Sequence, residues 1–514
     1  MRRPWLVCSL ALACGGAQIP PPHVQPGAPV ARNCAVADST VRLLAAMKQH
    51  VSIDAYITRG RPAVDLFVGD LEALLQAYKT ASDGKFDYTL IEAKDDEAKK
   101  KRAAAEGLKA VPMGYLGLVF HYGADKDVIP FLSPDLARGL EYLITNKIRE
   151  LRDKGDHVDH RIGTLTGHDE MKLSEPNLVA TDRGTPSVLD VITRNFTEFV
   201  FVDVDLKAGE RAIDDSLEGL IITQPAKDLG EKELRRIDEF VMKGKSLAVF
   251  ASSVNVRASD ATMSATLNAH GLDKLLDGYG IELRKDVVLD FASAYKAAMP
   301  AQRGAASVHF PQIIDAIGDP ADGDAQLVDS SVAPLFRVDE VILPFASSLV
   351  LHDDRQPGAT AMAVVARSSP RSLRTTDATV DLSPFQTWHP EGQGEQFNLA
   401  VEVEGRLRTA FPVGVDAAGV VPEGKQARVF VVASSQFTAN PFARAGNGPD
   451  VSQLHGMLAR GGDEKLLQIA GPYADLSPGS APILYCLLVL KNTLDWMANE
   501  PGVNALAGRR VCGK

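Results

Sequence analysis

The sequence predicts an α/β protein made of two α/β units in tandem, and three observations support this class. Strand-like runs alternate with amphipathic helical segments between residues 51 and 290. A buried-type strand returns at 428–433 after a stretch of short β-rich runs. The 514 residues also exceed what one compact domain usually holds. Alternating strands and helices favour a parallel, doubly wound sheet.

The first unit, predicted over 46–155, follows the order β-α-β-α-β-β-α. Its strands are expected at 51–58, 86–93, 116–122 and 127–132. The bond Val111-Pro112 stands just before the third strand, and X-Pro is the bond for which the cis form costs least. The order is thioredoxin-like. The turn at 58–62 contains no C-x-x-C, so thiol exchange is excluded there and the unit is expected to be a scaffold.

The second unit is predicted from two separated stretches, 156–300 and 426–500, with a β-rich insertion at 301–425 between them. Its parallel strands are expected at 161–166, 198–204, 217–223, 246–251 and 428–433. The final helix contains an apolar run at 483–490 that is too short to cross a bilayer. Residues 501–514 are expected to form a C-terminal tail.

Residues 1–13 have the layout of a secretory signal peptide. Two arginines precede an apolar run at 5–13, which is about half of the roughly 20 residues that a spanning helix needs. Ala11-Leu12-Ala13 would serve as an ordinary cleavage site. Together with Cys14 and the two glycines after it, this segment also resembles a bacterial lipobox, although Ala11 stands where leucine is usual.

Cys14 is therefore predicted to carry a lipid, with residues 14–45 as lipid anchor and tether. Five prolines between residues 20 and 29 favour an extended spacer that would hold a domain away from a membrane. The predicted location is the cell envelope, on the periplasmic side and lipid-anchored. Gly15 after the cysteine favours the outer membrane under the usual sorting pattern.

Three further cysteines belong to the part of the chain beyond Cys14. Cys34 and Cys512 stand near the two ends of the folded region and could pair in an oxidising compartment. The alternative that both are free is equally open, because connectivity does not follow from sequence. Cys486 lies among leucines and is expected to be a small core residue.

Composition excludes one class of partner and the histidines give no metal site. A net charge of −11 without a long basic stripe is a poor match for a phosphate backbone, so no nucleic acid is expected. His157 and His160 are separated from His168 by a strand about 20 Å long, so these three do not form a metal site. No cofactor is expected.

If a ligand binds in the second unit, it should bind where the parallel strands end. Open α/β sheets place their ligand crevice at the carboxyl ends of the strands. The residues expected there are Thr166, Gly167, His168, Asp169, Glu170, Thr223 and Gln224.

Four short motifs follow one another in a characteristic order over about 330 residues. They are Gly163-Thr164-Leu165-Thr166-Gly167-His168, Asp277-Gly278-Tyr279-Gly280-Ile281-Glu282-Leu283, Asp381-Leu382-Ser383-Pro384-Phe385 followed by Phe397-Asn398-Leu399-Ala400-Val401, and Asn492-Thr493-Leu494-Asp495-Trp496-Met497. Their order and spacing resemble the GldG-like family, the gliding-motility and uncharacterised ABC transport system auxiliary proteins. The resemblance covers roughly Val51 to Leu506.

This resemblance implies an extracytoplasmic component that acts beside an ABC permease and ATPase or other envelope proteins. It also implies a second unit similar to glutamine-amidotransferase-like sheets. Members usually carry flanking transmembrane helices. None is expected here at either end, which suggests a free-standing lipoprotein relative.

An amidotransferase-like sheet calls for a search for a nucleophile elbow. The turn after 217–223 offers Gln224-Pro225 and no nucleophile. Ser252-Ser253 and Ser434-Ser435 follow strands but lack the glycines of a tight elbow, and serines there usually form caps or turns. We therefore expect a non-catalytic scaffold or binding component. The alternative is a small-molecule or glycan-binding lipoprotein, and an amidotransferase-like hydrolase ranks last.

Overall fold

A computed structural model describes most of the folded chain. The described residues are 34–110, 114–174, 187–256, 263–300, 305–318, 326–338, 340–383, 386–412, 423–439 and 480–510. Several predictions fall outside them: the signal peptide, Cys14, most of the tether, the Val111-Pro112 bond, Pro384-Phe385 and Cys512.

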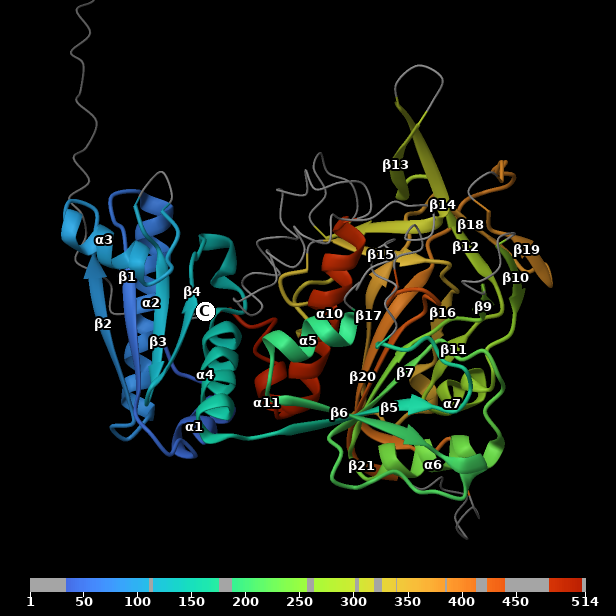
Figure 1. The fold of residues 1–514 in the computed structure, drawn as a ribbon, viewed down its shortest axis with the longest axis horizontal. Coiled ribbons are helices and arrows are strands. Elements are labelled where there is room, and N and C mark those ends of the chain that lie inside the picture. Colours follow the sequence, from blue (N-terminus) through green and yellow to red (C-terminus); the bar gives the residue numbers. More distant parts are fainter. Residues whose placement is uncertain are drawn as a thin grey trace, which may run out of the picture.

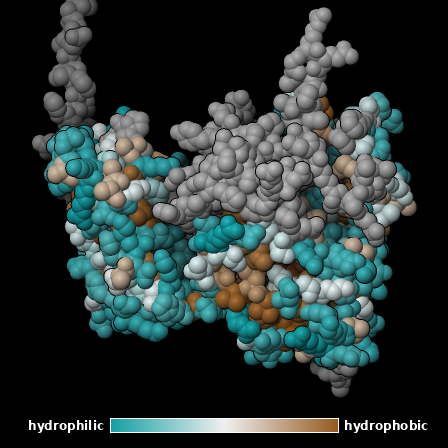
Figure 2. Space-filling model, in the orientation of Figure 1, coloured by the Kyte–Doolittle hydropathy of each residue, from teal (hydrophilic) through white to brown (hydrophobic). Residues whose placement is uncertain are grey.

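The N-terminal module contains a four-stranded mixed sheet of order β2-β1-β3-β4. Its strands are β1 (Val51–Ile57), β2 (Phe86–Glu92), β3 (Gly117–Tyr122) and β4 (Asp125–Ile129). β1 is parallel to β2 and antiparallel to β3, and β3 is antiparallel to β4. The module is the blue part of Figure 1, and its visible surface is largely hydrophilic in Figure 2.

The helices of this module are α1 (Asp38–Ala45), α2 (Pro62–Ala81), α3 (Glu97–Ala105) and α4 (Leu140–Asp156), with the 3-10 turn η1 (Pro134–Ala137) before α4. α2, α3 and α4 follow the predicted order, whereas η1 and α1 were not predicted. α1 lies within the stretch that was predicted to be tether. α2 begins at a proline, whose fixed φ suits a first helical turn. The apolar side chains that recur along it at 3.6-residue spacing are buried, namely Phe67, Leu71, Leu74, Leu75 and Tyr78.

The second unit is built on a nine-stranded sheet of order β11-β16-β20-β21-β8-β7-β5-β6, in which β17 also pairs with β20. Its strands are β5 (His160–Thr166), β6 (Phe199–Asp205), β7 (Gly219–Thr223), β8 (Ser246–Phe250), β11 (Ile281–Leu283), β16 (Leu349–Leu351), β17 (Ala361–Arg367), β20 (Asn398–Arg408) and β21 (Glu423–Val432). β6, β5, β7, β8 and β21 are mutually parallel. The returning strand therefore joins the sheet beside β8, as expected.

The stretch predicted as a β-rich insertion contributes to this same sheet. β16, β17 and β20 extend it with antiparallel pairing beyond β21. The other strands form small separate sheets: β9 (Val254–Asn255), β10 (Ser264–Leu267) and β19 (Thr379–Asp381), then β12 (Val287–Asp290) and β18 (Ser372–Thr375), then β13 (Ala294–Pro300), β14 (Ala305–Ile317) and β15 (Glu340–Pro344).

Helices cover both faces of the large sheet. The helices are α5 (Val188–Asn195), α6 (Glu231–Met242), α7 (Leu272–Gly278), α10 (Ser480–Ala498) and α11 (Pro501–Asn504). Ile221 of β7 belongs to the apolar cluster that contains α10, whereas its neighbours Leu220 and Ile222 belong to the cluster that contains α6 and α7. Successive strand residues point to opposite faces, so one strand serves both cores. The α/β class is thereby confirmed.

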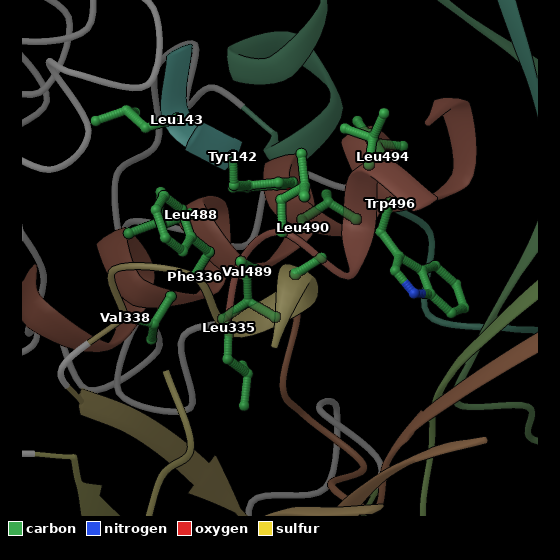
Figure 3. Packing of buried hydrophobic residues seen from close by; sticks show 14 of the residues in the cluster. Tyr142, Leu143, Leu335, Phe336, Val338, Leu488, Val489, Leu490, Leu494 and Trp496 are labelled. Atoms are coloured by element: carbon green, nitrogen blue, oxygen red, sulfur yellow. The ribbon is translucent and has the colours of Figure 1, made fainter. Parts of the chain in front are cut away.

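The C-terminal helix packs against the N-terminal module. In Figure 3, side chains of α10 converge with Tyr142 of α4 and with Phe336, which follows the 3-10 turn η4 (Ala333–Leu335). The Tyr142 and Phe336 rings meet edge to face, with centroids 4.7 Å apart. Among the described residues, no helix is both long enough and apolar enough to cross a membrane.

The two ends of the described chain lie beside each other. The Arg509 guanidinium donates to the carbonyl of Ala35 over 3.0 Å. Cys34 is disulfide-bonded, and its partner is not among the described residues. The pairing of Cys34 with Cys512 stays a prediction.

Candidate functional site

The predicted crevice residues lie at the carboxyl edge of the parallel strands. β5 ends at Thr166, and Gly167 makes the turn that follows with φ of +119°. That conformation is open to glycine and strained for other residues. The turn carries His168 and Glu170 inward, each 7% exposed. Asp169 points outward and pairs with Lys227 at 2.8 Å.

His168 connects the turn after β5 to the start of α6. Its Nδ1 lies 3.2 Å from Glu170 Oε1, and its Nε2 lies 3.0 Å from Glu233 Oε2. Glu233 also accepts a hydrogen bond of 2.8 Å from the N–H of Gly230, which caps the helix. Both ring nitrogens therefore face carboxylates. The imidazole connects the turn after β5 to α6, although His168 and Glu233 are 65 residues apart in sequence.

Gln224, directly after β7, makes a second set of polar contacts. Its Nε2 donates to Asn255 over 3.1 Å, and its Oε1 accepts from the N–H of Ser252 over 2.9 Å. Asn255 Oδ1 lies 2.8 Å from Nε2 of His270, whose Nδ1 lies 2.7 Å from Asp228. Contacts with the His270 ring and Asn268 hold the pKa of Asp228 below its usual range.

The structure thus brings the predicted residues together. The N–H of Met171 donates to the carbonyl of Gln224 over 2.9 Å, which joins the turn after β5 to the turn after β7. Thr223 is 6% exposed beside them. The inward-facing polar groups bind one another, so this edge is a closed polar layer.

Sequence reasoning missed Asp228, Glu233, Asn255 and His270 in this layer. Glu233 had a usable signal. A glutamate three residues after a helix-starting glycine occupies the capping-box position, and α6 begins at the same edge where β7 ends. Asn255 and His270 lie in loops, and no periodicity would have placed them there.

The serines considered as nucleophiles hold neighbouring segments. Ser252 Oγ donates to the carbonyl of Phe345 over 3.1 Å, Ser253 Oγ lies 2.8 Å from Ser347 Oγ, and Ser434 Oγ donates to the carbonyl of Pro344. Ser435 Oγ is buried without a hydrogen-bond partner within the described part of the chain. Within the described residues, the hydroxyls of Ser252, Ser253 and Ser434 bond to carbonyls or to another hydroxyl, not to a histidine or carboxylate that could act as a base.

The three N-terminal histidines of this unit have separate surroundings. His157 ends α4 in a left-handed conformation and is exposed. His160 and His168 lie at opposite ends of β5. Across the described stretches, no three histidine, cysteine or acidic side chains gather in a way that could hold a metal ion.

A second polar cluster joins α4 to α10, and sequence reasoning did not anticipate it. Arg149 lies 2.5 Å from Asp495, and Lys147 lies 2.7 Å from Glu150. Lys491 contacts both Glu150 and Asp495. All five side chains are at most 7% exposed. Burial raises the pKa of Asp495, and the two cations oppose that rise.

His160 borders this cluster at the start of β5. Its Nε2 lies 2.9 Å from Asp153, and its Nδ1 lies 3.0 Å from Glu218. Burial alone would lower the pKa of this imidazole. The hydrogen bonds with the two carboxylates outweigh burial and raise the pKa to about 9.

A small cavity lies at the same contact. Its volume is about 10 Å³, and its lining includes Tyr142, Asn146 and Asn492. The Tyr142 hydroxyl is buried and has no partner among the described residues. The space suits about one water molecule and excludes an organic cofactor.

With the geometry described, the chain can be compared with known families. Residues 159–458, more than half of the chain, match the family model described as ABC-type uncharacterized transport system. The chain belongs to this family. Its membership supports the resemblance drawn from the four motifs and an accessory role in a transport system. Residues 35–117, within the N-terminal module, match a domain of unknown function, DUF7088.

Comparison with curated proteins gives no match. Among solved structures, the mmIFT52 N-terminal domain is 10% identical with a TM-score of 0.28. The match covers 59% of the present chain and 98% of the mmIFT52 chain. The exo-beta-1,4-mannosidase Op5Man5 from Opitutaceae bacterium strain TAV5 is 12% identical with a TM-score of 0.21, covering 82% and 52% respectively. Both scores are too low to indicate a shared fold.

Proposed function

We propose that this protein is a non-catalytic, extracytoplasmic auxiliary component of an ABC-type transport or gliding-motility-like envelope system. Its role would be that of a scaffold or binding subunit. The observation that carries the proposal is the family match over residues 159–458. The closed polar layer at the carboxyl edge supports a scaffold, because His168, Glu170 and Gln224 already bind neighbouring protein groups.

The proposed attachment is a lipid on Cys14, which would hold the folded part on the periplasmic side of a membrane, with the outer membrane favoured. The support is the lipobox-like segment and the proline-containing tether. Metabolic lipid labelling should mark the wild-type chain and leave Cys14→Ala unlabelled. Recovery of the wild type as an unlabelled soluble protein would refute the anchor.

The proposed folds of the two units are a thioredoxin-like scaffold followed by an amidotransferase-like sheet. The strand order β2-β1-β3-β4, with β3 antiparallel to β1, is consistent with the first. Five parallel strands with helices on both faces are consistent with the second. A solved structure whose strand order differs from β2-β1-β3-β4 would remove the first assignment.

The test of the function is co-purification from native membranes. The affinity-tagged full chain, extracted in mild detergent, should recover permease and ATPase subunits in fixed ratio. The matched control is Cys14→Ala, which should lose these partners together with its membrane attachment. Recovery of the wild type without either subunit contradicts the proposal.

The alternative is a small-molecule or glycan-binding lipoprotein that uses the carboxyl edge near His168. The buried polar side chains at the strand ends favour it, since open α/β sheets bind ligands there. It predicts a compound that raises the melting temperature of the wild type and has no effect on Gly167→Trp. Equal stabilisation of both proteins would exclude this site.

A further inference from the structure

β6 is the open edge of the large sheet. It comes last in the strand order, and within the described ranges its strand partner is β5 alone. The N–H of His160 donates to the carbonyl of Glu198 over 2.7 Å. Because backbone groups of alternate residues point to the same side of a strand, this bond shows that the even-numbered residues of β6 bond to β5. The backbone N–H and C=O groups of Phe201 and Asp203 therefore point to the open side.

Apolar side chains line this edge, which has no second partner strand among the described residues. Val200 is 37% exposed, and Phe201 and Val202 are half-buried. Figure 2 shows hydrophobic surface on the visible face over the β5–β6 region that Figure 1 labels. Exposed edges are usually protected by charged side chains, above all lysine, by proline or by a bulge. β6 carries Asp203 and Asp205 near its end but no lysine or proline, and its pairing with β5 runs without a register shift over all seven residues.

We infer that a second copy of this chain pairs with β6 in antiparallel orientation, with the two-fold axis at Val202. The strand complements itself in this register. Phe201 lies opposite Asp203 of the second copy, so their outward N–H and C=O groups can exchange hydrogen bonds. Val200 lies opposite Val204 of the second copy, and the two copies of Val202 meet at the axis.

Charge selects this register over its neighbour. With the two-fold axis at Val202, Asp203 and Asp205 lie opposite Phe201 and Phe199 of the second copy. With the axis at Val204 instead, Asp203 would lie opposite Asp205 of the second copy. Two carboxylates directly opposite each other destabilise a strand pair. The valines of both copies also lie on one face of the joined sheet, because directly opposed residues share a face.

Cysteine cross-linking tests the axis. Val202→Cys places two thiols at a non-hydrogen-bonded pair, where Cα atoms are about 4.5 Å apart and a disulfide can form. The matched control is Val200→Cys, whose counterpart in the second copy lies about 13 Å away along the strand. Under mild oxidation the full-length Val202→Cys chain should run as a covalent dimer, and Val200→Cys should run as a single chain. Equal cross-linking of both overturns the register.

Sedimentation of the full chain in detergent tests the pairing itself. The wild type should have the mass of two chains. Asp203→Pro should sediment as one chain, because it removes an outward N–H without breaking a backbone hydrogen bond to β5. Asp203→Ala loses the same 3.2 Å hydrogen bond from Thr164 but keeps the N–H, so it should remain a dimer. A wild type that stays a single chain at every concentration, or cross-links only to another protein, overturns the inference.

Discussion

At the scale of single residues, His160 shows how a buried charge depends on its partners. Asp153 and Glu218 stabilise the imidazolium on either side of the ring, and together they outweigh the effect of burial on its pKa. The side chain is 6% exposed, so its proton is held by protein groups and little by water.

This arrangement predicts a pH dependence of stability. The pKa of His160 is raised from 6.5 to about 9 in the folded protein. Its contribution is then complete below pH 6.5 and is lost as pH rises through 9. The urea midpoint of the wild type should fall over that window relative to His160→Gln. If the difference in urea midpoint between the two proteins stayed constant from pH 6 to 10, His160 would not take up a proton on folding.

At the scale of elements, α4 and α10 are joined through charges rather than through apolar side chains alone. Lys491 and Asp495 are one helical turn apart and reach Arg149 and Glu150 on α4. Such buried pairs need every partner, because a charge left alone in a protein interior is costly. The contact specifies one arrangement of the two helices.

Removing one cation should therefore destabilise the contact strongly. Lys491→Met leaves Glu150 and Asp495 undercompensated and should cost about 3–5 kcal/mol of unfolding free energy. Lys154→Met, which removes a side chain 56% exposed, should cost less than about 1 kcal/mol. Chemical denaturation measures both. A loss for Lys491→Met no greater than for the control would show that the cluster is not stabilising the fold.

Sequence patterns predicted the elements better than their partners. The 3.6-residue spacing in α2 and the buried-type run of β21 gave the correct elements, because each depends on local periodicity. The contact of Lys491 with Glu150 spans 341 residues and leaves no local signal. The charges following the apolar run of α10 were visible, but their partners became evident only when the helices were placed together.

At the scale of the whole molecule, the described ends of the chain meet beside α4. The N–H of Gly139 donates to the carbonyl of Arg509 over 2.8 Å, and Arg509 also reaches Ala35. Cys34, next to Ala35, is disulfide-bonded. Cys512 follows this contact by three residues in sequence, which makes it our proposed partner.

The proposed pairing gives a direct prediction for the oxidised protein. Cys512→Ser should leave Cys34 open to a thiol reagent under non-reducing conditions, whereas Cys486→Ser should leave it blocked, because Cys486 is a free buried thiol. Mass spectrometry of the labelled peptides reads both results. Blocked Cys34 in Cys512→Ser would assign the bond to another cysteine.

The return of β21 to the centre of the sheet bears on how the protein is made. Arg428 pairs in register with Ser246, so two adjacent strands are synthesised about 180 residues apart. The interior strand β8 has one side without a neighbour until β21 has emerged from the ribosome. Long-range pairing of this kind is slow to form. A nascent chain would therefore stay incompletely folded through most of its synthesis.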